Sequence, residues 1–151
     1  MIKYLRINNL YKKYKLNKSL VHNLVNEIKN LLDFSIKNID INFVNNDVIK
    51  QINIDYLKHN YTTDIITFNY DGNNKILNSE IFISIDEAKD NAEYFKCSLN
   101  DEIVRLIIHG FLHLVGYDDM NDQDYKVMKS KEDELVSIFA PKYKGIISDT
   151  R

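Results

Sequence analysis

Two histidines four positions apart are the residues of this sequence most suited to chemistry. His109 and His113 lie in an apolar stretch between Arg105 and Gly116. In a helix, this spacing puts both rings on one face, with Cα atoms about 6 Å apart along the axis. Two imidazoles at that separation can bind one Zn²⁺ ion at ~2.0–2.1 Å. An unpaired imidazole in an apolar helix is costly, which favours a metal site over two core histidines.

The acidic turn after this helix offers the third ligand that a zinc site needs. Gly116 is a natural helix stop, and Asp118 and Asp119 follow it. If the chain turns back there, either carboxylate can reach the ion. Gly110 lies between the two histidines and costs about 1 kcal/mol relative to alanine in a helix interior. The glycine therefore predicts a close neighbour beside His109, either a substrate or another part of the backbone.

The same segment resembles the signature of the YbeY-type endoribonucleases, which are bacterial rRNA maturation factors. That signature reads His-Gly-x-Leu-His-Leu-x-Gly-Tyr-Asp-His, and eight of its nine defined positions match this chain between His109 and Asp118. Residues 53–56 and 63–68 are similar to a second family block, Asn-x-x-Tyr-Arg followed by Thr-Asp-Val-Leu-Ser-Phe, at the same spacing. Residues 80–84 and 128–132 resemble the next strand and the closing helix of the family.

The resemblance implies a zinc-dependent endoribonuclease that cuts single-stranded RNA in rRNA maturation and ribosome biogenesis. A water activated by one Zn²⁺ ion would attack the phosphodiester, and His109, His113 and Asp119 would hold the ion. Asp119 stands where the family usually has a third histidine. A carboxylate oxygen is an acceptable zinc ligand and leaves a fourth position open. The implied partners are an rRNA precursor and the ribosome or a ribosomal protein.

A second departure concerns the contact with phosphate. Leu57 stands where the family usually has an arginine, so a bidentate phosphate clamp is missing. Lys58, the next residue, is one candidate replacement. Arg105 is another, because it lies one turn before His109 on the same helix face. The alternative for Arg105 is an ordinary surface charge.

The general base must come from outside the histidine helix. Gly110 fills the place of the glutamate in the His-Glu-x-x-His motif of metalloproteases, which argues against a metallopeptidase. Asp118, Glu80 and Asp64 are the candidate bases, although such an acid is more often a structural cap or a surface charge. A rival from another class is a non-catalytic factor that binds rRNA or a ribosomal protein, with a structural metal or none.

The periodicity of apolar residues predicts a single α+β layered domain at residues 1–140, with a loose tail at 141–151. A four-stranded mixed sheet and about five helices are expected, with the metal site on a central helix. We expect strands at residues 1–8, 39–43, 64–70 and 80–85, and helices at residues 19–33, 48–56, 84–95, 100–116 and 122–139.

Composition limits the classes of function. The net charge of −2 argues against a protein that binds nucleic acid through bulk positive charge. The charge is uneven, because residues 1–60 carry +5 and residues 61–151 carry −7. This pattern fits either two differently solvated faces or a basic surface beside an acidic pocket for a cation. A single cysteine, Cys97, and the lack of a long apolar run predict a cytoplasmic protein without membrane contact.

Overall fold

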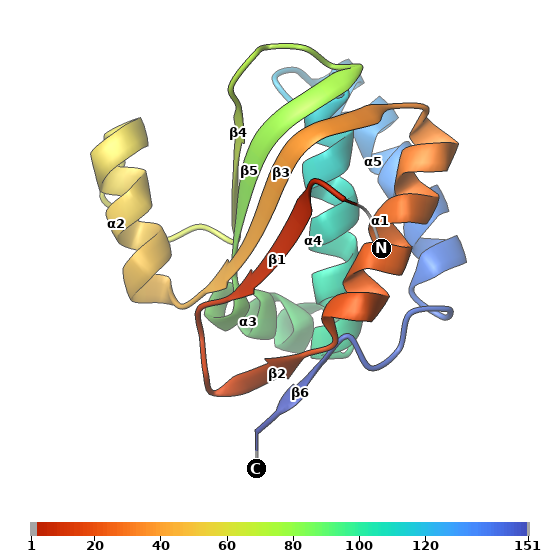
Figure 1. Ribbon diagram of the computed structural model, residues 1–151. Coiled ribbons are helices and arrows are strands. Elements are labelled where there is room, and N and C mark those ends of the chain that lie inside the picture. Colours follow the sequence, from red (N-terminus) through yellow and green to blue (C-terminus); the bar gives the residue numbers. More distant parts are fainter. Residues whose placement is uncertain (1–2, 151) are drawn as a thin grey trace.

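A four-stranded mixed sheet lies at the centre of the computed structural model, which describes residues 3–150 (Figure 1). Its strands are β1 (Leu5–Asn9), β3 (Ser35–Val44), β5 (Ile76–Ser84) and β4 (Ile65–Asn69), in that order across the sheet. β1, β3 and β5 are parallel, and β4 runs antiparallel to β5. The predicted α+β class and mixed sheet are confirmed. Residues 1–2 of the first expected strand lie outside the described residues.

Five helices surround the sheet, as predicted. They are α1 (Lys18–Leu32), α2 (Asn46–Leu57), α3 (Ile85–Phe95), α4 (Leu99–Leu114) and α5 (Asp122–Phe139). Each begins after an Asn or Ser side chain that accepts a backbone N–H three residues later, which satisfies one of the free donors of the first turn. No helix within residues 3–150 is long and apolar enough to cross a membrane.

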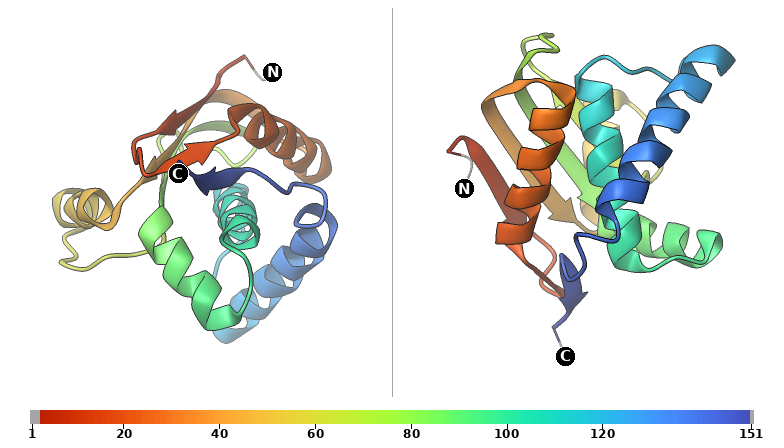
Figure 2. Two further views of the ribbon diagram at one scale, coloured as in Figure 1. Left: turned by 90° about the horizontal axis from the view of Figure 1, so that it is seen from below. Right: turned by 90° about the vertical axis from the view of Figure 1, so that its right-hand side faces the viewer.

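Most helices lie on one face of the sheet. α1, α4 and α5 stand together on that face, and α2 covers part of the other (Figures 1 and 2). Alternating residues of the strands separate the two faces. Ile41 and Ile81 belong to the main core together with α4, while Val44 and Ile66 form a smaller cluster with Ile49 of α2. Ten of the sixteen residues of α4 are buried, so this helix is the rigid centre on which a site can be built.

Gly110 allows α4 to approach the sheet closely. A Cβ atom at this position would lie 3.0 Å from Cδ1 of Ile65, and 3.6 Å from side-chain atoms of Thr67 and Ile81. The close neighbours of the glycine are therefore side chains of β4 and β5. We had expected a substrate or another backbone segment beside this glycine. The neighbours are side chains of the sheet instead.

The chain after Pro141 is docked, unlike the loose tail that we expected. Tyr143 and Ile146 are buried in the main core. β6 (Ile147–Asp149) pairs antiparallel with β2 (Tyr14–Leu16), a second small sheet that the sequence analysis missed. Tyr143 also donates a hydrogen bond to Glu27 of α1. Apolar side chains at 143, 146 and 147 close the core between α1 and α4, and this burial outweighs the ordering of a short terminal segment.

The packing at Gly110 predicts a coupled effect on stability. Gly110→Ala should gain little in the wild type, because the helix-propensity gain of about 1 kcal/mol is offset by crowding against Ile65. Ile65→Val deletes the Cδ1 atom at 3.0 Å. In the Ile65→Val protein, Gly110→Ala should raise the free energy of unfolding again. Urea unfolding of the two single variants and the double variant should therefore give a coupling free energy of about 0.5–1 kcal/mol. If the changes in unfolding free energy of the two single variants add to that of the double variant within about 0.3 kcal/mol, the contact between Gly110 and Ile65 would be contradicted.

Candidate metal centre

The end of α4 and the turn that follows bring together three side chains that could hold a metal ion. Gly116 has a φ of +112°, a conformation that favours glycine and reverses the chain after the helix. One ligand atom from each of His109, His113 and Asp119 lies within 4.8 Å of the others. Donor atoms about 2.1 Å from one tetrahedral ion lie about 3.4 Å from one another, so the group must contract by up to about 1.4 Å to hold zinc, and Asp119 is its exposed member.

Both imidazole rings are oriented by hydrogen bonds at Nδ1. Nδ1 of His109 lies 2.6 Å from Oε1 of Glu132 on α5, and Nδ1 of His113 lies 3.0 Å from the backbone carbonyl of Tyr117. A carboxylate and a carbonyl can only accept, so in each neutral ring Nδ1 carries the hydrogen and donates it. Nε2 is then left with its lone pair, which is the arrangement that outer hydrogen bonds give to metal-binding histidines.

Arg105 holds Glu132 in place from the other side. Its Nη1 donates to Oε2 of Glu132 at 3.2 Å, and its Nε and Nη2 donate to the two oxygens of Glu102 at 2.8 and 2.5 Å. The side chains of Glu102 and Glu132 are only 2% and 4% exposed. Burial opposes the charge of Arg105, but the bonds to Glu102 and the attraction of Glu132 outweigh it and raise the pKa of the guanidinium.

Glu132 is held ionised by His109 and Arg105, and Nζ of Lys129 lies 3.6 Å from its Oε2. Burial on its own would raise the pKa of this carboxyl group. The hydrogen bond from His109 and the charge of Arg105 outweigh that effect and lower the pKa below its usual value. An ionised Glu132 accepts from both sides, which fixes the His109 ring relative to α5.

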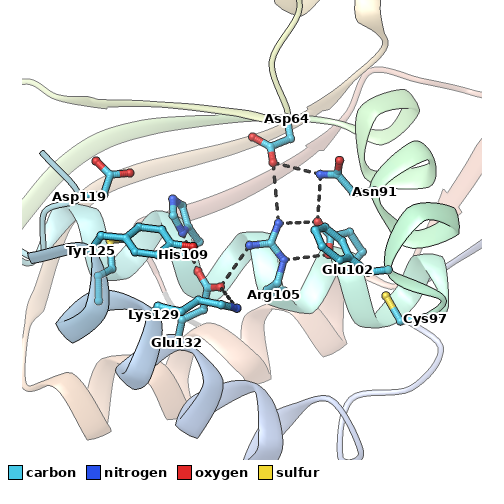
Figure 3. Close-up of a pocket in the computed structure, with 12 residues that line it drawn as sticks. Asp64, Asn91, Cys97, Glu102, Arg105, His109, Asp119, Tyr125, Lys129 and Glu132 are labelled. Carbon is cyan, nitrogen blue, oxygen red and sulfur yellow. Dashed lines mark hydrogen bonds and ion pairs between the residues drawn. The ribbon is translucent and has the colours of Figure 1, made fainter. Parts of the chain in front are cut away.

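A cavity of about 580 Å³ opens beside these residues (Figure 3). Its lining contains four carboxylates and two basic side chains, a formal charge of −2. Such a charge attracts a cation and repels a free phosphate group. The residues that line the cavity are Asp64, Asn91, Phe95, Cys97, Glu102, Arg105, His109, Asp119, Tyr125, Met128, Lys129 and Glu132.

The three candidate bases lie at different positions relative to the cavity. Asp64 lines the cavity, where its Oδ2 lies 3.8 Å from Arg105 and accepts a hydrogen bond from Asn91. Asp118 is exposed, and its Oδ1 accepts from the backbone N–H of Asp119 at 2.7 Å. Glu80 accepts from Asn42 and Tyr70 on the opposite face of the sheet. Of the three acids, only Asp64 is part of the cavity wall.

Neither Lys58 nor Arg105, the two residues expected to contact phosphate, lies where it is free to do so. Lys58 ends α2, where its Nζ donates to the backbone carbonyl of Asp55, and it does not line the cavity. Arg105 is no free surface charge, because its guanidinium is engaged by Glu102, Glu132 and Asp64. It holds other side chains in position and has little capacity left for phosphate. Lys129, which sequence analysis did not single out, lines the cavity with a side chain that is 45% exposed.

The sequence analysis also missed the roles of Glu132, Asn91 and Tyr125. Glu132 lies 23 residues from His109 on a different helix, so no local spacing connects them. Tyr125 is 54% exposed and lines the cavity. Glu102 and Arg105 are three residues apart on one helix, which was a readable sign of their ion pair.

Comparisons with known proteins agree with the resemblance seen in the sequence. The family model described as Endoribonuclease YbeY matches residues 6–140. An Endoribonuclease YbeY of Flavobacterium johnsoniae is 41% identical over 64% of this chain and 69% of its own length. One of Cytophaga hutchinsonii is 38% identical over 76% of this chain and 80% of its own. The solution structure of TM1509 from Thermotoga maritima superposes with a TM-score of 0.62 at 26% identity, covering 88% of this chain and 87% of that one.

The ion-pair network predicts a large effect of Arg105→Met on stability. This change leaves Glu102 and Glu132 buried without their cation, which should cost about 3–5 kcal/mol in the free energy of unfolding. Adding Glu102→Gln should recover part of that loss, because it removes one uncompensated charge. Lys131→Met is the control, since Lys131 pairs only with the exposed Glu134 and should cost less than about 1 kcal/mol. Equal effects of the two methionine variants in urea unfolding would refute the network.

Proposed function

The chain belongs to the YbeY endoribonuclease family, and we propose that it cuts single-stranded RNA during rRNA maturation with one Zn²⁺ ion held by His109, His113 and Asp119. The observation that supports this proposal most directly is the pair of oriented imidazoles beside an exposed carboxylate. Two nitrogens and one oxygen form a ligand set that suits zinc and leaves a position open to solvent. We place the protein in the cytoplasm, with an rRNA precursor and the ribosome as its partners.

The chemistry of the donor set fits a catalytic ion. When bound, Zn²⁺ would lower the pKa of a coordinated water to about 7 and polarise a phosphoryl oxygen. His109 and His113 present Nε2 because their Nδ1 atoms are occupied. Asp119 lies on the exposed side, where its carboxylate can adjust as the site closes.

The charge of the cavity makes the cation necessary for substrate binding as well. A cavity with a formal charge of −2 repels the phosphodiester of RNA. A divalent cation would offset that charge. Lys129, at the cavity wall, has a side chain that is 45% exposed, and its Nζ lies 2.8 Å from Asp133 and 3.6 Å from Glu132. To bind phosphate in place of the family's arginine, where this chain has Leu57, Lys129 would exchange its exposed pair with Asp133 for a phosphate oxygen.

Asp64 is the proposed general base. It lies in the cavity wall with Oδ2 turned to Arg105 and Asn91, so Oδ1 remains able to accept a proton from the attacking water. Neither Asp118 nor Glu80 lines the cavity, and both carboxylates hold local hydrogen bonds. Asp64 therefore takes the role that sequence analysis left open among three acids.

Metal content and RNA cleavage should be lost together. Purified wild-type protein should contain about one zinc ion per chain by elemental analysis and should cut single-stranded RNA. His113→Ala and Asp119→Ala should lower both, and a chelator should stop cleavage. Asp122→Ala is the matched control, since Asp122 is exposed and outside the ligand group, and it should keep its zinc. Unchanged zinc in Asp119→Ala would remove that residue from the site. RNA binding without any cleavage would favour a non-catalytic biogenesis factor.

Asp64→Asn should separate chemistry from metal binding. A general base contributes about 10²–10⁴-fold, so kcat for RNA cleavage should fall by at least about 100-fold. Zinc content should stay at the wild-type level, because Asp64 is not one of the three ligands. Glu80→Gln is the control and should leave kcat within about threefold, since it faces away from the cavity. Wild-type cleavage by Asp64→Asn would exclude the assignment.

A further inference from the structure

The cavity continues past the three ligands along α4. Arg105 separates an end with His109, Asp119 and Tyr125 from an end with Asn91, Glu102 and Cys97 (Figure 3). Glu102 and His109 are seven residues apart on one helix, which is about 10 Å along its axis. The far end is therefore distant enough from the ligands to hold a separate part of a substrate.

The amide of Asn91 has a fixed orientation at this far end. Its Nδ2 donates to Oδ2 of Asp64 at 3.1 Å and to Oε2 of Glu102 at 3.2 Å. Both partners are carboxylates that accept, so the nitrogen must face them and the assignment cannot be reversed. Oδ1 of Asn91 has no hydrogen-bond partner among residues 3–150. It is an acceptor held ready for a donor from a ligand.

Phe95 adds an apolar wall to the same end. It lies one turn after Asn91 on α3, so the amide and the ring share a helix face. Its side chain is 63% exposed although it lines the cavity. The adjacent Tyr94 lies outside the lining, but its ring packs edge-on against that of Phe95 at 5.0 Å between centroids, so Tyr4, an exposed aromatic residue outside the lining, is the comparison.

The charges at this end exclude a phosphate as its occupant. Asp64 and Glu102 supply two carboxylates against the single guanidinium of Arg105, and that guanidinium is already paired with both. An uncharged planar group with N–H donors fits better, because it can stack on Phe95 and donate to Asn91. In single-stranded nucleic acid such a group is an unpaired base.

We propose that the far end of the cavity, formed by Asn91, Phe95 and Glu102, is a subsite for one unpaired base of the RNA. The base stacks on Phe95 and donates a hydrogen bond to Oδ1 of Asn91. A base with an exocyclic amino group, as in adenine, guanine or cytosine, is preferred. Uracil offers only N3–H, between two carbonyl oxygens, one of which would face the carboxylate of Glu102. This subsite rests on the proposed function, since it positions the substrate of the same cavity.

Free nucleosides test the subsite without cleavage, because they carry no phosphate. Adenosine, cytidine, guanosine and uridine are titrated into the zinc-loaded protein while the side-chain amide signals of Asn91 are followed by NMR. Saturable shifts are expected, with uridine binding the most weakly. Phe95→Ala should weaken adenosine binding about 5- to 100-fold, the range of a lost base–aromatic stack. Phe95→Leu should have a smaller effect, and Tyr4→Ala should change the affinity less than twofold.

RNA kinetics provide the second arm. Phe95→Ala should raise KM for single-stranded RNA by at least about fivefold with a smaller change in kcat, and Tyr4→Ala should leave both unchanged. Nucleoside binding that survives Phe95→Ala, or no saturable shift with any nucleoside, would overturn the subsite. Nucleoside binding that depends on Phe95 in a protein that never cuts RNA would overturn the proposed function and keep the subsite.

Discussion

The contact between Glu132 and His109 is the interaction on which the candidate site depends. It joins α5 to α4 at 2.6 Å and decides which nitrogen of the imidazole faces the ligand group. A buried carboxylate is stable there only because Arg105 compensates its charge from the other side. Arg105 in turn is fixed by Glu102, so the position of one histidine is set by an ion-pair network that spans two helices.

The fold keeps that network rigid. α4 is buried along most of its length, and Gly110 brings it close to Ile65 and Thr67 of β4. The helix therefore cannot rotate without breaking core contacts, and His109 and His113 keep their common face. The docked residues after Pro141 close the same core from the side of α1. Precise placement of the ligands is thus a consequence of packing that surrounds them.

Features that depend on local spacing could be predicted from the sequence. The five helices, the four strands of the main sheet, the shared face of the two histidines and the helix stop at Gly116 all follow from residues close together in the chain. Features that depend on distant residues could not. The pairing of Glu132 with His109 and the docking of β6 on β2 join segments whose contact no local pattern encodes. β3 begins at Ser35, earlier than predicted. Polar residues such as Lys37 and Asn38 interrupt the alternation of apolar and polar residues there, so the pattern did not mark this part as a strand.

An acidic cavity in an RNA-cutting enzyme becomes reasonable once a cation is part of the site. The charge of −2 that repels a phosphate is the charge that attracts a divalent ion, so metal and substrate would bind in that order. The carboxylate of Asp119 in place of a histidine adds to this negative charge. This carboxylate strengthens the attraction for the ion. It also makes phosphate binding more dependent on the presence of the ion.

Nitrogen NMR of the histidine rings during a zinc titration tests the account most directly. The account predicts that the Nε2 signals of His109 and His113 shift together and saturate at about one equivalent of zinc. Both Nδ1 atoms should keep their hydrogens throughout, because Glu132 and the carbonyl of Tyr117 accept them. Zinc that binds through Nδ1, or leaves both rings unchanged, would contradict it.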